Sequence, residues 1–290
     1  MTHLVRQLMR LSYWQSRKCL SGYGLPRFRF VRFMDRLIQA IIRSDVVDVL
    51  GHRMYLDRGD SLHLSTEGVY EPLVTELVQK EVRPGDVVLD IGAHIGYYTL
   101  IFAGRVGPDG RVFAFEPEPG NCALLEKNVH ANGYHNVAIL RKAVAEKAGT
   151  VRLYPAEDNS GDNRIYDSHD GRRFLEVETM RLDDYFPGDR WKVDFIKMDI
   201  QGAEYAALCG MGALLNRNTG VKLVTEFWPF GLAMFGIDPK AYLQSLAGHG
   251  FRFSNIDERQ GKVLPASIPE LLAAYTVEKQ NQTNLFCTPG

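Results

Sequence analysis

The amino-acid sequence predicts a doubly wound α/β fold, in which helices cover both faces of a mainly parallel sheet. Short apolar runs alternate with helical patterns from about residue 71 to the end of the chain. The first of these runs leads into a glycine-containing turn, within "VVLDIGAHIGYYTL" at residues 87–100. Alternating strands and helices require right-handed crossovers and a parallel sheet. A glycine turn after the first strand is also where such sheets bind ligands.

The individual elements follow from residue spacing and turn residues. "VVDVLGHRMYLD" alternates as a hairpin does, and residues 71–82 have helical spacing with Pro72 in the first turn, where proline is tolerated. Residues 150–154 and 175–180 alternate like strands around a polar loop. The remaining pattern predicts strands at 87–90, 111–115, 137–141, 193–198, 221–227, 251–256 and 284–287, and helices from about 96, at 119–131, from about 203 and at 239–247.

The first 43 residues differ in charge from the rest of the chain. They carry nine Arg and Lys residues against Asp35 as the single acid, and apolar residues recur at helical spacing from about residue 28. This pattern predicts a basic amphipathic helix. We therefore divide the chain into a helical extension with a hairpin at 1–68 and a main domain at 69–290. The apolar face of the helix could contact an anionic membrane surface, the main domain or a second subunit of a homodimer, and packing against protein is favoured.

Composition narrows the class of protein. A chain of 290 residues with 45% hydrophobic and 24% charged residues is typical of a globular protein. No apolar run approaches the ~18 residues that cross a bilayer, and the start lacks a signal-peptide pattern. The four cysteines lack metal-binding spacings and a disulfide framework, and the net charge of −1 gives no indication of nucleic-acid binding. We expect a cytoplasmic protein, with any membrane contact peripheral at the inner face.

The glycine turn argues against a dinucleotide. Dinucleotide-binding turns read G-x-G-x-x-G, and the second glycine admits the pyrophosphate. Here the turn reads D-I-G-A-H-I-G, with His94 at the position of close approach and Asp90 at the end of the strand. A carboxylate directed into the site would repel a diphosphate and would suit an ammonium group. Gly92 and Gly96 still allow a ligand to approach the backbone, and the helix that follows offers free N–H groups.

The second strand of the main domain adds a ribose-binding residue. It ends in "VFAFEPEP", which places Glu116 about 20 residues beyond the glycine turn. A carboxylate there can accept hydrogen bonds from both ribose hydroxyls. A ligand with a ribose and an amine but no phosphate is required, and S-adenosylmethionine meets these conditions.

Several motifs together resemble the FkbM family of S-adenosylmethionine-dependent methyltransferases. They are "EGVYEPLVTELV", "VVLDIGAHIGYYTL", "FAFEPEPGN", "RLDDYF", "VDFIKMDIQGAE" and "VTEF", in this order between about Val69 and Ile256. The resemblance implies the class I methyltransferase fold, which is Rossmann-like and has an antiparallel last strand in a parallel sheet. It also implies O-methylation of a hydroxyl, often on a sugar, glycan or polyketide product.

The resemblance assigns roles to residues of this sequence. It places Asp90, Gly92, Ala93 and Gly96 on the cofactor turn, Glu116 on the ribose, and Ala143 and Val144 beside the adenine. Two positions depart from the family pattern. His94 replaces the usual asparagine of the turn, and Gln201 replaces the glutamate of a D-x-E-G motif that begins here at Asp199. Gln201 can form hydrogen bonds but cannot take a proton.

Methyl transfer to a hydroxyl needs alignment and benefits from a base near the acceptor oxygen. Asp199 at the end of the fourth strand is the favoured catalytic base, with Glu226 at the end of the fifth strand and His169 in the polar loop as alternatives. His94 in the cofactor turn is a further candidate for the base and a candidate cofactor-binding residue, as is Asp199. Glu71, which leads into the helix before the sheet, could contact the methionine end of the cofactor. Asp199 and Glu226 could also bridge a divalent ion, although no local ligand cluster requires one.

Two other functions compete with this interpretation. A nucleic-acid methyltransferase could share the cofactor fold, but amino-group methylation of bases usually relies on an Asn/Asp-Pro-Pro-aromatic turn where this chain has "MDIQGAE". A noncatalytic cofactor-binding scaffold could act through the basic helix, but such a protein would not need both predicted cofactor carboxylates, Asp90 and Glu116. Fold alone cannot name the acceptor.

Overall fold

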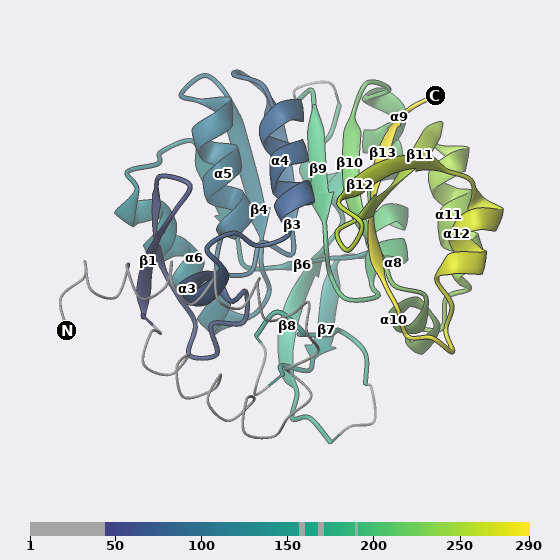
Figure 1. Ribbon diagram of the computed structural model, residues 1–290, viewed down its shortest axis with the longest axis horizontal. Helices are drawn as coiled ribbons and strands as arrows, with labels where there is room; N and C mark the ends of the chain where they lie inside the picture. The colour runs from purple at the N-terminus through teal and green to yellow at the C-terminus, as the bar shows by residue number, and fades with distance from the viewer. Residues whose placement is uncertain (1–43, 157–159, 168–170, 189–190) are drawn as a thin grey trace.

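The computed structural model describes residues 44–156, 160–167, 171–188 and 191–290 (Figure 1). Its strands are β1 Val46–Val49, β2 His52–Tyr55, β3 Val87–Ile91, β4 Arg111–Phe115, β5 Val137–Leu140, β6 Ala143–Val144, β7 Gly149–Leu153, β8 Leu175–Met180, β9 Phe195–Met198, β10 Lys222–Phe227, β11 Phe251–Asp257, β12 Lys262–Ala266 and β13 Thr283–Pro289. Its helices are α3 Leu64–Glu67, α4 Pro72–Glu81, α5 Tyr97–Val106, α6 Pro119–Ala131, α7 Leu182–Tyr185, α8 Glu204–Cys209, α9 Gly212–Arg217, α10 Pro229–Met234, α11 Pro239–Gly248 and α12 Ile268–Ala274.

The main sheet has eight strands in the order β12-β11-β13-β10-β9-β3-β4-β5. Strands β5, β4, β3, β9 and β10 are parallel, whereas β13 runs antiparallel between β10 and β11. This arrangement confirms the predicted doubly wound sheet with an antiparallel last strand. The strand order reverses at β3, so the turn that follows β3 lies at the switch point where doubly wound sheets bind ligands.

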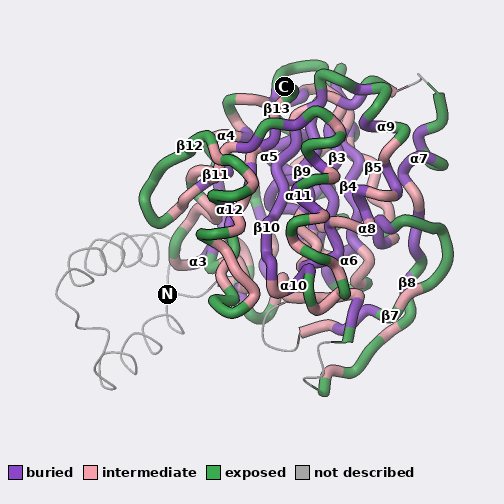
Figure 2. Tube along the Cα trace, turned by 90° about the vertical axis from the view of Figure 1, so that its right-hand side faces the viewer, coloured by how far each residue is buried: buried purple, intermediate pink, exposed green. Residues whose placement is uncertain are grey.

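Two hydrophobic clusters cover the two faces of the sheet. Side chains alternate along each strand, so Leu89 of β3 packs with α8, α9 and α11, while its neighbour Val88 packs with α4, α5 and α6. The central strands are buried along their length, whereas β12 at the edge is mostly exposed (Figure 2). A buried sheet of this kind provides a rigid support for the residues at its carboxyl edge.

The predicted hairpin forms from β1 and β2 and packs against the main domain. The Tyr55 N–H donates to Asn128 of α6 at 2.7 Å, and Met54 lies in the same hydrophobic cluster as α4, α5 and α6. The predicted strands on either side of the polar loop are β7 and β8, which pair antiparallel and extend the molecule below the main sheet in Figure 1. The predicted basic helix lies outside the described residues.

Three elements in the last quarter of the chain were not predicted. They are the edge strand β12, which pairs with β11, and the helices α10 and α12. Their short lengths and mixed composition give little periodicity to detect. Within the part of the chain that the structure describes, no helix combines the length and the hydrophobicity that a membrane crossing needs.

Candidate active site

The turn between β3 and α5 holds its shape because glycine occupies its tightest position. Gly92 has φ +84°, in the left-handed region, and a Cβ there would overlap the carbonyl oxygen of Asp199. The N–H groups of Gly92 and Ala93 both donate to the Phe115 carbonyl, at 3.0 Å each. The turn is therefore pressed between the ends of β4 and β9, and Gly92 keeps it close to Asp199.

Three residues without a glycine's freedom adopt the same left-handed conformation around this turn. Glu71 has φ +42°, His94 has φ +52° and Gln201 has φ +55°. Such conformations are strained for residues that carry a side chain and concentrate at functional sites. Glu71 precedes α4, His94 precedes α5 and Gln201 precedes α8. Three helix starts therefore converge on one edge of the sheet.

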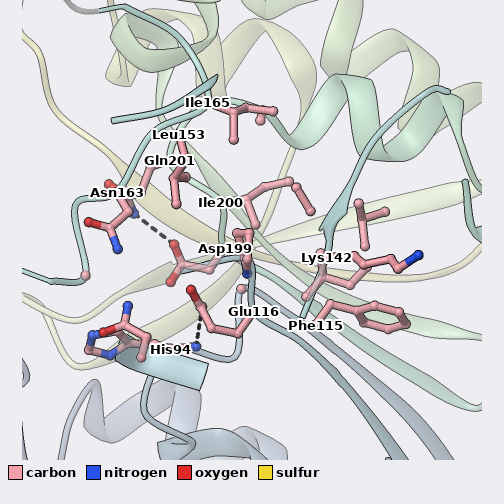
Figure 3. Close-up of a pocket in the computed structure, with 18 of the residues that line it drawn as sticks. His94, Phe115, Glu116, Lys142, Leu153, Asn163, Ile165, Asp199, Ile200 and Gln201 are labelled. Carbon is pink, nitrogen blue, oxygen red and sulfur yellow. Dashed lines mark hydrogen bonds between the residues drawn. The ribbon is translucent and has the colours of Figure 1, made fainter. Parts of the chain in front are cut away.

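Glu116 lies at the end of β4 and borders a cavity that we call the β4 cavity. It is lined by Gly92, His94, Glu116, Ala143, Val144 and Asp199 among others. The Glu116 carboxylate accepts the His94 N–H at 2.8 Å (Figure 3) and, on its other oxygen, the Glu118 N–H at 2.9 Å. Burial raises the pKa of Glu116 to about 7. The Asn121 side chain also forms a hydrogen bond with this carboxylate, and the remaining lone-pair capacity of its oxygens can accept a ligand hydroxyl group.

A second cavity, which we call the α5 cavity, adjoins the first. It is lined by Ala93, Tyr98 and Lys197, and it shares Gly92, His94 and Asp199 with the β4 cavity. His94 lies between the two, and burial lowers its pKa to about 4, so the ring is neutral. Its Nε2 forms a hydrogen bond with Ser160 Oγ at 2.8 Å. Its Nδ1 is buried without a partner among the described residues.

Lys197 on β9 and Asp199 just beyond it form a buried ion pair that sequence reasoning did not predict. The Lys197 Nζ lies 3.1 Å from Asp199 Oδ2, and the Lys197 side chain is 3% exposed. Burial opposes ionisation of both groups, but their mutual attraction raises the pKa of Lys197 and lowers that of Asp199. A lysine between apolar residues on a buried strand rarely lacks a charged partner. The sequence "FIKMD", in which a lysine lies within an apolar strand and an acid follows two residues later, could have indicated this ion pair.

Asp90 and Gly96, the other predicted residues of the cofactor turn, lie next to α5. Neither residue lines the β4 or the α5 cavity. Asp90 is buried beneath the turn, where it accepts a hydrogen bond from Thr99 Oγ1 of α5 at 2.5 Å, and burial raises its pKa to about 6. A Cβ on Gly96 would lie 2.7 Å from Leu125 Cδ1 of α6. Both residues therefore help to fix α5 in place.

Gln201 connects Asp199 to Glu226 at the end of β10. The Gln201 Nε2 donates to Asp199 Oδ1 at 2.9 Å and lies 3.4 Å from both Glu226 oxygens. Burial, followed by the charge of Asp199, raises the pKa of Glu226 well above its ordinary value. The Gln201 amide thus donates between two carboxyl groups.

Glu71 lies on the same side of the site as Glu226. Its carboxylate accepts hydrogen bonds from Tyr98 Oη and Asn284 Nδ2, both at 2.8 Å, and burial raises its pKa. Glu71 and Glu226 line a third cavity, the C-terminal cavity, together with Glu258, Arg259, Ala274 and Gln282 among others. His169, the remaining predicted candidate, lies outside the described residues.

A family model described as "Methyltransferase FkbM domain" matches residues 90–253. The chain belongs to the FkbM methyltransferase family. The match contains the turn, Glu116, the Lys197–Asp199 pair and Glu226, and it confirms the resemblance that the sequence motifs indicate.

Individual relatives of this FkbM-family chain match over part of their length. The 31-O-demethyl-FK506 methyltransferase FkbM of Streptomyces tacrolimicus is 29% identical over 163 residues, which are 45% of this chain and 61% of that protein. A protein-L-isoaspartate O-methyltransferase of Aeropyrum pernix is 40% identical over 135 residues, 46% of each chain. The chain thus spans about half the length of the curated relatives it matches.

Among solved structures, an S-adenosylmethionine-dependent O-methyltransferase from Thermotoga maritima is similar with a TM-score of 0.43 and 14% identity. It covers 87% of this chain and 81% of that chain. Aeropyrum pernix fibrillarin, crystallised with natively bound S-adenosylmethionine, is similar with a TM-score of 0.42 and 12% identity, over 75% of this chain and 74% of that chain.

The cofactor of this FkbM-family domain is S-adenosylmethionine, and the residues present fit it. The remaining acceptor capacity of the Glu116 carboxylate matches a ribose hydroxyl, and Ala143 and Val144 line the same cavity, where the base could lie. Asp199 is an ionised carboxylate shared by both cavities, which suits an ammonium group. The unpartnered His94 Nδ1 adds a polar atom in the wall between the cavities.

Proposed function

We propose that this protein is an S-adenosylmethionine-dependent O-methyltransferase that methylates a hydroxyl group of a sugar, glycan or polyketide-type acceptor. The observation that supports it best is the chain of groups from Asp199 through Gln201 to Glu226. This series of side chains starts in the cofactor cavities, at Asp199, and ends at the buried carboxyl group of Glu226, which borders the C-terminal cavity.

Within this proposal, Glu226 is the proton acceptor and Asp199 a cofactor-binding residue. S-adenosylmethionine supplies the methyl group on a positively charged sulfur. Both Asp199 oxygens already accept hydrogen bonds, from Lys197 and Gln201, and its lowered pKa makes it a weak base. Among the described residues, the Glu226 carboxyl group has long contacts with Gln201, at 3.4 Å, and burial raises its pKa. The raised pKa makes the ionised Glu226 carboxylate a stronger proton acceptor than Asp199, whose pKa is lowered. Glu226 would hold the hydroxyl proton on a carboxylate oxygen.

Charge at the site disfavours a nucleic-acid acceptor. Nucleic-acid binding depends on Lys and Arg residues that neutralise phosphates. The C-terminal cavity carries Glu71, Glu226, Asp257 and Glu258 against Arg259. The name of the Streptomyces relative states that it methylates 31-O-demethyl-FK506, which supports a small hydroxyl-bearing acceptor for this chain.

Two measurements test the proposal. Calorimetry should detect binding of S-adenosylmethionine and S-adenosylhomocysteine and no binding of NADH. Methyl-labelled S-adenosylmethionine should then label sugar or polyketide alcohols through an ether bond that withstands mild base. Binding of NADH alone would overturn the cofactor assignment, and label transferred to RNA, or to protein as a base-labile ester, would overturn the acceptor class.

A further inference from the structure

The C-terminal cavity is built at the carboxyl edge of the sheet by elements far apart in the sequence. The residue before α4, the end of β10, the turn after β11, the end of α12 and the start of β13 all contribute to it. These elements lie on the side of β11 and α12 in Figure 1. Its volume of about 280 Å³ lies near the lower end of the about 300–1,000 Å³ typical of ligand pockets. The space therefore fits one small ring and excludes a long polymer segment.

Two residues connect this cavity with the cofactor site. Glu226 lines it and contacts Gln201, which lines both cofactor cavities. Glu71 also lines it and accepts the hydroxyl hydrogen of Tyr98, which lines the α5 cavity. The C-terminal cavity thus adjoins the two cofactor cavities through Glu226 and Glu71.

The walls of the cavity are held by hydrogen bonds that need no ligand. Glu258 accepts the backbone N–H groups of Leu73 and Val74, at 2.9 and 3.1 Å, and so caps the start of α4. Asn284 donates to Glu71 at 2.8 Å, and Thr283 donates to Asn255 at 2.7 Å. These contacts tie α4 to β11 and β13. A preformed cavity loses little conformational entropy when it binds a ligand.

The polar groups of the cavity match uncharged hydroxyls. Burial favours the neutral acids of Glu71 and Glu226, and a neutral carboxyl group both donates and accepts hydrogen bonds. The side chains of Gln282 and Asn284 add amide groups. Asp257 and Glu258 repel anions, while Arg259, the cation among the lining residues, is exposed. An anionic ligand would meet carboxyl groups from several elements at once.

We propose that the C-terminal cavity binds the methyl acceptor, and that the acceptor presents to it an uncharged, hydroxyl-bearing ring of about the size of one monosaccharide. The inference rests on the proposed O-methyltransferase function and specifies its acceptor. Within it, Glu226 contacts a ring hydroxyl, and the rest of the acceptor extends out past Arg259 and Gln282.

A pair of tryptophan variants on α12 tests the location. Ala274 lines the cavity, while its neighbour Ala273 does not, and both are exposed. Ala274→Trp should fill the cavity, and Ala273→Trp is the matched control. Neutral methyl glycosides of common hexoses and 6-deoxyhexoses are the probes, detected by saturation-transfer NMR on protein saturated with S-adenosylhomocysteine. Ala274→Trp should weaken glycoside binding by at least about tenfold, because the probe and the indole compete for one volume. Ala273→Trp should bind as the wild type does.

A second comparison tests the charge selectivity. A methyl glucoside and the corresponding methyl glucuronide differ only at the C6 position, and the glucuronide should bind at least about tenfold more weakly because its carboxylate faces like charges. The inference is overturned if no neutral glycoside binds the wild type, if Ala274→Trp binds as the wild type does, or if the glucuronide binds better. Glycoside binding without any calorimetric signal for S-adenosylhomocysteine would instead overturn the proposed function and leave the cavity as a sugar site.

Discussion

The cofactor side and the C-terminal side of the site are built in different ways. On the cofactor side, backbone geometry dominates: Gly92 and His94 adopt left-handed conformations and the His94 N–H binds Glu116 across 22 residues. On the C-terminal side, side chains dominate. Glu71 is joined to Asn284 across 213 residues, and Glu258 caps α4 across 185 residues. Cofactor binding is thus encoded in short motifs, whereas the C-terminal cavity depends on the complete fold.

Charge separates the two sides as well. Lys197 and Asp199 are held as an ion pair on the cofactor side, whereas burial favours the neutral acids of Glu71 and Glu226 on the other. Gln201 lies between them and donates toward both Asp199 and Glu226. Substitutions on each side should therefore have different consequences for binding, turnover and stability.

The largest effect is expected for Glu226→Gln. The amide keeps the shape of the side chain but cannot take a proton, so turnover should fall by about 10²- to 10⁴-fold. Affinity for S-adenosylhomocysteine should change little, because Glu226 lines neither cofactor cavity. In the wild type, turnover should rise with pH as Glu226 loses its proton from a raised pKa, and this limb should be absent in the variant. Steady-state kinetics across pH would measure both effects. Turnover close to that of the wild type would return the role of base to Asp199.

Lys197→Met should have the next largest effect, on stability. Removing one member of a buried ion pair costs about 3–5 kcal/mol, and Asp199 would remain as a buried charge. Asp199 has a lowered pKa in the folded protein, so its stabilising contribution is present at neutral pH and is lost as pH falls through that pKa. The deficit of the variant should accordingly shrink in acid, as denaturant unfolding at several pH values would show.

Lys222→Met is the matched control for this variant. Lys222 lies on the adjacent strand β10 and pairs with Glu81 at 2.7 Å, but the two side chains are 28% and 22% exposed. This pair should contribute about 0–1 kcal/mol, as ion pairs near the surface do. Equal losses of stability for the two variants would mean that burial of the Lys197–Asp199 pair does not increase its contribution to stability.

The sequence predicted what depends on local pattern. The central strands, the hairpin, the turn at Gly92 and the position of Glu116 all follow from periodicity and short motifs. The depth of Asp90 could not be predicted in this way, because strand alternation does not tell which polar group faces the cavity and which faces a neighbouring helix. The C-terminal cavity was missed for a different reason. Residues such as Ala274 and Gln282 carry no chemical signal until β13 and α12 are placed beside β10.

Gly92→Ala should have a smaller effect that tests the backbone side. A Cβ at this position would overlap the Asp199 carbonyl, so the loss of stability should exceed the cost of the left-handed conformation by about 1–3 kcal/mol, and S-adenosylhomocysteine should bind more weakly. Gly85→Ala is the control, because Gly85 has a similar φ of +87° but no heavy atom near the added Cβ. It should lose about 1–2 kcal/mol from the left-handed conformation alone and should bind the cofactor normally. Normal cofactor binding by both variants would contradict the role given to the turn.

The smallest effect is expected for Glu116→Gln, which keeps an acceptor oxygen for the ribose but removes the charge. Its affinity for S-adenosylhomocysteine at pH 8 should fall by about 1 kcal/mol, the difference between charged and neutral hydrogen-bond acceptors. Burial raises the pKa of Glu116 from 4.5 to about 7, so the folded wild type retains this proton over a range in which the unfolded chain has lost it. The stability gained from that proton is complete below the unfolded pKa and is lost as pH rises through about 7.

Ribose hydroxyls favour the ionised form of Glu116, so wild-type affinity for S-adenosylhomocysteine should increase between pH 6 and pH 8, around this pKa of about 7. Calorimetry of both proteins across this range should show a pH-dependent wild type and a nearly pH-independent variant. The same pH dependence in both would assign the titrating group to another residue of the site, and the ribose would have to be bound elsewhere.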